Sequence, residues 1–221
     1  MKPFAVLLPI AIAAVSHAAA HAGTAASTYV EGVLGVGFQG GLGVHGVDQV
    51  LGPFAVDEDL KPGWMASLLV GHRVGDTPLS IEAEGAYLQN DVKSPDLDQA
   101  FGAALGVRSR VTGALVNARL QPLRDIAMGS LRAAPYVAAG AGYGRTDISI
   151  LGDHYPGDGW MWQAKAGVAF AVTPRLSWDL GYRYLRLPSF DTNKLGLAAH
   201  FKPDAQVVSV GVRYVLAPFG P

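Results

Sequence analysis

The stretch LSWDLGYRYLRL, residues 176–187, alternates bulky apolar side chains with small or charged ones. Leu176, Trp178, Leu180 and Tyr182 occupy one phase, and serine, aspartate, glycine and arginine fill the other. Successive side chains of a β-strand point to opposite faces, so the stretch predicts a strand with one oily face and one polar face. The fold of the whole chain depends on which of these faces meets water.

Residues 1–22 predict a cleaved secretory signal peptide. Lys2 supplies the positive start, residues 4–15 form the apolar run, and residues 20–22 (AHA) match an A-x-A cleavage site. A transmembrane anchor is the alternative, but the run is short, contains Pro9 and ends in small residues. We therefore expect an exported mature chain that begins immediately after this segment.

The composition excludes several classes of protein. The 17 Lys and Arg residues nearly match the 18 Asp and Glu residues, so no basic excess favours a nucleic-acid partner. Without cysteine, the chain holds neither disulfides nor thiolate metal sites. Half of the residues are hydrophobic, yet no run of about 18 apolar residues follows the signal segment, which excludes helical membrane spans. The apolar surface must therefore be distributed over strands.

Eight alternating segments predict eight strands separated by turn-rich stretches, at residues 28–40, 64–74, 79–90, 110–121, 135–147, 160–172, 176–187 and 206–216. Short turns at 75–78 and 173–175 alternate along the chain with long loops, a pattern typical of outer-membrane barrels. The expected fold is all-β, an eight-stranded antiparallel up-and-down transmembrane β-barrel.

Two connections are ambiguous in the sequence. The link between the fourth and fifth strands, residues 122–134, is long for the short-turn rim, and we expect it to hold a small helical turn. Residues 91–109 fit either a short helix or an early start of the fourth strand, and the alternation of Phe101, Leu105 and Val107 favours the strand.

The content of the polar face indicates that it lies inside the barrel. Glycine, alanine and single charges suit a narrow lumen, whereas the surface of a soluble barrel would be dense in lysine and glutamate. Because an unpaired interior charge is costly, the inward charges predict a structural salt-bridge network. The members of this lumen charge network are Glu31, Arg73, Glu82, Glu84, Arg119, Lys165, Asp179, Arg183 and Arg213.

The opposite face carries hardly any charge, and its aromatic residues recur near the segment ends. Such positions are typical of the aromatic girdles at the two membrane interfaces. The predicted interface aromatics are Tyr87, Trp162, Phe170, Trp178, Tyr182 and Tyr214.

No catalytic residue, metal site or cofactor is predicted. His45, His154 and His200 are expected in long loops, and no local signature places a serine beside any of them. Acidic residues at 57–59, 153 and 158 are also expected in long loops, where solvated side chains are common.

Residues 23–216 resemble the family of small eight-stranded outer-membrane barrels that includes opacity-type surface proteins and the membrane domain of outer membrane protein A. The resemblance is carried by the strand pattern, by PYVAAGAGYG at 135–144, and by Ser209-x-Gly211-x-x-Tyr214-x-Leu216 at the final strand. It implies an outer-membrane location, outer-membrane lipids and lipopolysaccharide around the barrel, and recognition of the last strand by the outer-membrane assembly machinery. Residues 217–221 would form a short tail.

The resemblance implies a structural, surface-interaction or adhesion role, with extracellular ligands reaching the loops. Three alternatives stay open at this point. One is an enzyme that modifies outer-membrane lipid, another is a narrow channel for ions or small solutes, and the third is a soluble periplasmic carrier.

Overall fold

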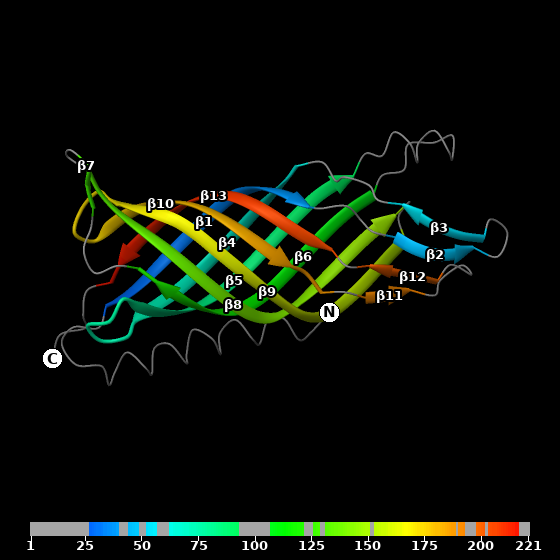
Figure 1. Cartoon of the computed structure of the whole chain (residues 1–221), viewed down its shortest axis with the longest axis horizontal. Helices are drawn as coiled ribbons and strands as arrows, with labels where there is room; N and C mark the ends of the chain where they lie inside the picture. The colour runs from blue at the N-terminus through cyan, green and yellow to red at the C-terminus, as the bar shows by residue number, and fades with distance from the viewer. Residues whose placement is uncertain are drawn as a thin grey trace.

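A closed β-barrel dominates the computed structural model of the chain (Figure 1). The structure describes residues 27–39, 44–48, 52–56, 62–92, 107–121, 126–128, 131–150, 153–188, 190–192, 198–201 and 203–216. The barrel strands are β1 (Thr28–Gln39), β4 (Gly63–Arg73), β5 (Leu79–Val92), β6 (Val107–Leu120), β8 (Leu131–Ile150), β9 (Asp153–Ala171), β10 (Leu176–Arg186) and β13 (Asp204–Val215).

Each of these eight strands pairs with two antiparallel neighbours. The sheet runs in the order β6-β5-β4-β1-β13-β10-β9-β8, and pairing of β6 with β8 closes the ring. At the seam between the first and last strands, β1 pairs with β13 from Tyr29–Val215 to Gln39–Ala205. Closure removes the unpaired backbone groups of a sheet edge, which confirms the predicted fold class. No helix within the described ranges is long and apolar enough to cross a membrane.

Four short strands form a second sheet beyond one end of the barrel (Figure 1). They are β2 (Val44–Asp48), β3 (Gly52–Val56), β11 (Phe190–Thr192) and β12 (Ala198–Phe201), in the order β11-β12-β2-β3. The sequence predicted long loops here, so His45 and His200 lie in strands rather than loops. The pairing joins segments about 150 residues apart, a long-range contact that no local pattern reports.

The link before β8 also differs from the prediction. Instead of a helical turn, Ile126–Met128 forms β7, which pairs with Leu131–Ala133. Because β6 pairs with β8 only from Val137 onward, the first residues of β8 have a free edge that β7 covers. Backbone pairing thus replaces the hydrogen bonds that a helical turn would have supplied.

The hairpin of β8 and β9 extends well past its predicted ends. Asp147 lies opposite Pro156, and Arg145 lies opposite Asp158. His154 and Asp158 therefore belong to β9 and not to a loop. Strand β6 begins three residues before the predicted position, and residues 93–106 lie outside the described ranges. The predicted signal peptide and C-terminal tail also lie outside them.

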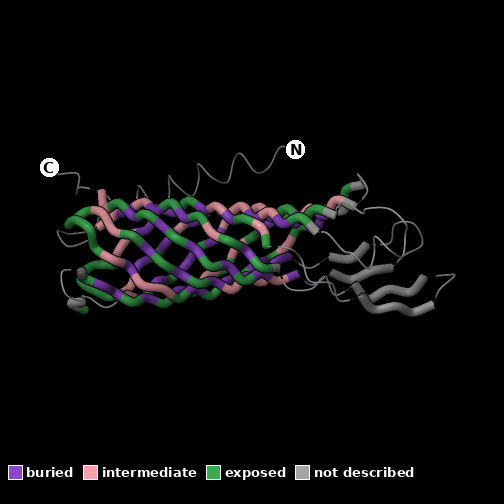
Figure 2. Tube along the Cα trace, turned by 90° about the horizontal axis from the view of Figure 1, so that it is seen from above, coloured by how far each residue is buried: buried purple, intermediate pink, exposed green. Residues whose placement is uncertain are grey.

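Burial alternates along every barrel strand, as the tube in Figure 2 shows. In β10, Trp178 is 49% exposed and Asp179 is 4% exposed, while Tyr182 is 45% exposed and Arg183 is 3% exposed. The charged residues of the opening stretch therefore point into the barrel, and its aromatic residues point outward. The outer face is covered by large apolar side chains, including Leu34, Leu68, Val116, Val137, Leu180 and Val210.

Candidate functional site

The half of the lumen nearer the short turns is crossed by a buried ionic layer. The Arg213 side chain binds Glu31 through two nitrogens, Nη2 at 2.6 Å and Nε at 2.9 Å from Oε2. Arg119 lies at the centre of the layer, with Nη2 3.0 Å from Asp179 Oδ2 and Nη1 3.6 Å from Glu31 Oε2. Arg119 Nη1 also lies 3.8 Å from Glu82 Oε1, so one guanidinium group forms ion pairs with three carboxylates.

The same layer continues toward the middle of the barrel through Lys165. Its Nζ lies 3.0 Å from Glu82 Oε2 and 3.1 Å from Glu84 Oε2. Arg183 completes the chain of ion pairs with Nη1 2.6 Å from Glu84 Oε1. These contacts join β5 to β9 and β10 across the interior.

Eight of the nine predicted lumen charges are thus linked in one buried network. Its four carboxylates belong to Glu31, Glu82, Glu84 and Asp179, and its four cations belong to Arg119, Lys165, Arg183 and Arg213. The formal charges cancel, as burial in a narrow interior requires. Arg73, the ninth, is half-buried at the end of β4 and lines a cavity at the short-turn mouth instead.

Uncharged polar residues complete the network, and none of them is among the lumen residues predicted from the sequence. Tyr29 donates a hydrogen bond to Glu82 at 2.8 Å, and Tyr136 donates one to Asp179 at 2.6 Å. Asn117 and Gln163 donate to Glu84 at 2.9 and 2.7 Å. Each lies two residues from another inward position on its own strand, so strand phase was the signal that could have found it.

Aromatic rings support the two central arginines. The Arg119 guanidinium carbon lies 3.4 Å from the centre of the Tyr136 ring, and that of Arg213 lies 4.4 Å from the centre of the Tyr29 ring. Cation–π contacts of this kind add to the ion pairs where water is excluded. Each of the two tyrosines therefore contacts an arginine with the face of its ring and donates a hydrogen bond from its hydroxyl group to a carboxylate.

We expect Tyr136→Phe to lower the free energy of unfolding by about 1.5–3 kcal/mol, because it removes a buried hydrogen bond to a charged group. Urea unfolding of the barrel in lipid vesicles, followed by tryptophan fluorescence, measures the loss. Tyr143→Phe is the control, since Tyr143 is 48% exposed on the outer face. Equal stability of the two variants would contradict the proposed bond.

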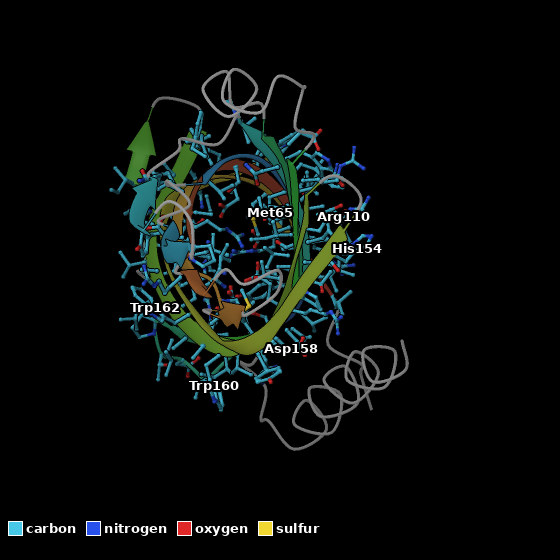
Figure 3. All side chains as sticks on the ribbon, turned by 90° about the vertical axis from the view of Figure 1, so that its right-hand side faces the viewer. Met65, Arg110, His154, Asp158, Trp160 and Trp162 are labelled. Carbon is cyan, nitrogen blue, oxygen red and sulfur yellow. The ribbon has the colours of Figure 1, made fainter. Side chains whose placement is uncertain are left out.

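An apolar layer lies inside the barrel on the long-loop side of the ionic network. A single buried cluster is formed by Met65, Leu88, Val111, Leu115, Met161, Leu185, Leu187, Ala205 and Val207. The sequence pattern predicted small or charged residues on the inward face, and this half of the lumen differs. Figure 3 views the barrel from the end that carries the second sheet, with Met65 inside the ring of strands and Trp160 and Trp162 outside it.

All six predicted interface aromatics lie on the outer face. Near the short-turn end, Trp178 lies opposite Phe170, and Tyr214 lies opposite Leu176. Toward the long-loop end, Tyr87 packs against Trp64 with ring centres 5.0 Å apart, and Trp162 against Tyr184 at 5.5 Å. Tyr182 donates a hydrogen bond to Gln206 at 3.0 Å. The arrangement is that of two aromatic bands separated by aliphatic residues.

Nothing in the described part of the chain groups three His, Cys, Asp or Glu side chains as a metal site requires. A closed antiparallel barrel with an apolar exterior and an ionic interior defines an integral β-barrel membrane protein. The family comparison agrees with this class, because residues 5–215 match the outer membrane protein beta-barrel domain family. The chain belongs to that family and is a protein of the bacterial outer membrane.

Solved structures with the same fold share little sequence with this chain. Neisserial surface protein A is 18% identical with a TM-score of 0.53, and the match covers 86% of this chain and 99% of that one. The outer membrane protein AlkL, solved by solid-state NMR in DMPC bilayers, is 13% identical with a TM-score of 0.57, covering 90% and 95%. No curated protein matches the sequence. The structural similarities therefore describe the fold.

Proposed function

We propose that the protein is a plugged barrel with a non-enzymatic role at the cell surface, in envelope integrity or in contact with extracellular partners. The observation that supports the proposal is the pair of buried layers inside the barrel, the ionic network and the apolar cluster. Solutes that enter from the short-turn mouth meet the ionic network, and solutes that enter from the other end meet the apolar cluster. A dry apolar constriction also opposes ion passage, because ions lose their hydration there.

If the lumen is closed to solutes, the function of the protein must be carried by the exterior of the barrel. Long loops of outer-membrane barrels face the outside of the cell, and binding residues are common on loops that a rigid scaffold holds. Here the second sheet gives the loop end an ordered surface formed by two segments distant in sequence. This sheet is the part of the chain that we propose for surface contact.

We expect the purified barrel to give no large, steady conductance in planar lipid bilayers. The ionic layer and the apolar layer lie in series along the lumen, and the proposal requires that together they obstruct the path. Single-channel recording at neutral pH and high salt is the measurement. A stable open channel in most insertion events would contradict the sealed lumen.

The surface role needs a separate test in whole cells. Replacing residues 44–56 with a flexible Gly-Ser linker removes β2 and β3 and leaves the barrel strands unchanged. We expect cells that display this variant to adhere less to epithelial cells or matrix proteins than cells that display the complete chain. Equal adhesion, at equal surface amounts of the two proteins, would contradict a role of this sheet in contact.

A further inference from the structure

The short-turn mouth of the barrel contains a cavity of about 130 Å³ that the ionic network does not fill. Four arginines line it: Arg73, Arg132, Arg175 and Arg213. The described residues around it include serines, a threonine and Gln121, and none of them is an aspartate or a glutamate. The cavity is therefore cationic and rich in hydrogen-bond donors.

The four arginines reach the cavity from different strand ends. Arg73 ends β4, Arg132 lies at the start of β8, and Arg175 lies in the turn between β9 and β10. Arg213 is buried at the inner wall, on β13 opposite Ser177. The barrel closure, rather than any local motif, brings these side chains together.

Among the four arginines, only the innermost has a carboxylate partner within the described ranges. Arg213 is held by Glu31 at 2.6 Å. Within the described part of the chain, no ion pair links Arg73, Arg132 or Arg175 to an acidic side chain. The eight-member network is neutral without them, so these three charges are not needed to balance the lumen.

Three cations that have no acidic partner among the described residues lie around one concave mouth and repel each other, and a bound anion would relieve that repulsion. Guanidinium groups match the geometry of phosphate and carboxylate oxygens and form paired hydrogen bonds with them. We propose that this mouth is a binding site for a small multivalent oxyanion that carries phosphate or carboxylate groups. The proposal goes beyond the surface role, since short turns of such barrels face the periplasm and the ligand would be a periplasmic solute.

The cavity ends at the ionic network, so the anion binds at the mouth and does not pass through. Its inner wall is Arg213 with Tyr29, and both side chains already contact the network. Binding would therefore add an anion to the cationic end of a neutral layer.

The test is isothermal titration calorimetry of the folded barrel in nonionic detergent at low ionic strength. Inorganic pyrophosphate and citrate are titrated separately, which distinguishes a phosphate ligand from a carboxylate ligand. We expect one-site saturable binding of at least one of them, weakened by added salt because the arginines are partly exposed. Binding of neither anion would overturn the proposal.

Two double variants provide the matched comparison. Arg73→Gln with Arg132→Gln should weaken binding on the order of tenfold or more, since it removes two of the charge-assisted contacts. Arg108→Gln with Arg145→Gln removes the same charge from exposed residues of β6 and β8 outside the cavity lining, and should leave binding unchanged. Equal weakening in both would show a non-specific charge effect and overturn the site. Unheated gels of each variant verify that the barrel is folded.

Discussion

Arg119→Met is expected to lower the free energy of unfolding by about 3–5 kcal/mol, because it breaks a buried charge network by removing one partner. Arg119 is 2% exposed and contacts Glu31, Glu82 and Asp179. Methionine keeps an unbranched apolar stem but removes the guanidinium group, which leaves three buried carboxylates against two remaining cations at this end of the layer. Urea unfolding in lipid vesicles, followed by tryptophan fluorescence, gives the change.

Arg108→Met is the control for this experiment. Its side chain is 49% exposed and pairs with Asp91, which is 61% exposed, at 2.8 Å. Exposed ion pairs contribute only about 0–1 kcal/mol, so this variant should unfold nearly as the wild type does. A loss for Arg119→Met no larger than that for Arg108→Met would mean that water reaches the interior network.

Leu34→Arg is expected to cost about 2–4 kcal/mol, the cost of placing arginine on the lipid face near the bilayer midplane. Leu34 lies in the middle of β1 and is 67% exposed, whereas its neighbour Val33 is 6% exposed and points inward. In a soluble barrel the same substitution would place a charge in water at almost no cost. Unfolding in vesicles measures the difference, and it tests which face meets lipid.

Val172→Arg serves as the matched variant at the edge of the membrane. Val172 is 55% exposed and lies in the turn after β9, near the short-turn rim. The cost of a lipid-facing arginine falls to about 0–1 kcal/mol near the interface. If Leu34→Arg were as mild as Val172→Arg, the outer face could not be in contact with hydrocarbon.

The barrel could be predicted from the sequence because alternation survives in most of its strands. Trp178 and Asp179 show the two faces of β10 directly, and the structure exposes the first and buries the second. The apolar layer was not predictable in the same way. Val207 of this layer faces inward and its neighbour Val208 faces outward, so both faces are apolar there and the period of two disappears from the sequence.

Strand phase predicts which charged residues point into the lumen, but it does not predict which of them form ion pairs with each other. Strand phase puts Arg119 and Asp179 on the inward side, yet their contact at 3.0 Å depends on closure of the barrel, which brings side chains of β6 and β10 into one lumen. The second sheet was missed for a related reason. Its pairing of His45 with His200 crosses most of the chain length, and the participating segments are only three to five residues long.

The distribution of network charges along the chain has a consequence for assembly. Strands β1, β5 and β6 contribute three carboxylates and Arg119, a net charge of −2, while β9, β10 and β13 contribute three cations and Asp179, a net charge of +2. If either half of the chain inserted into the bilayer alone, it would therefore carry unpaired charges. The contact of Glu31 with Arg213 joins the first strand to the last, and a slip of one residue there would turn the arginine outward. Insertion and sealing of the seam should accordingly occur as a single concerted event, with opposite polarity drawing the two ends of the polypeptide into the correct alignment.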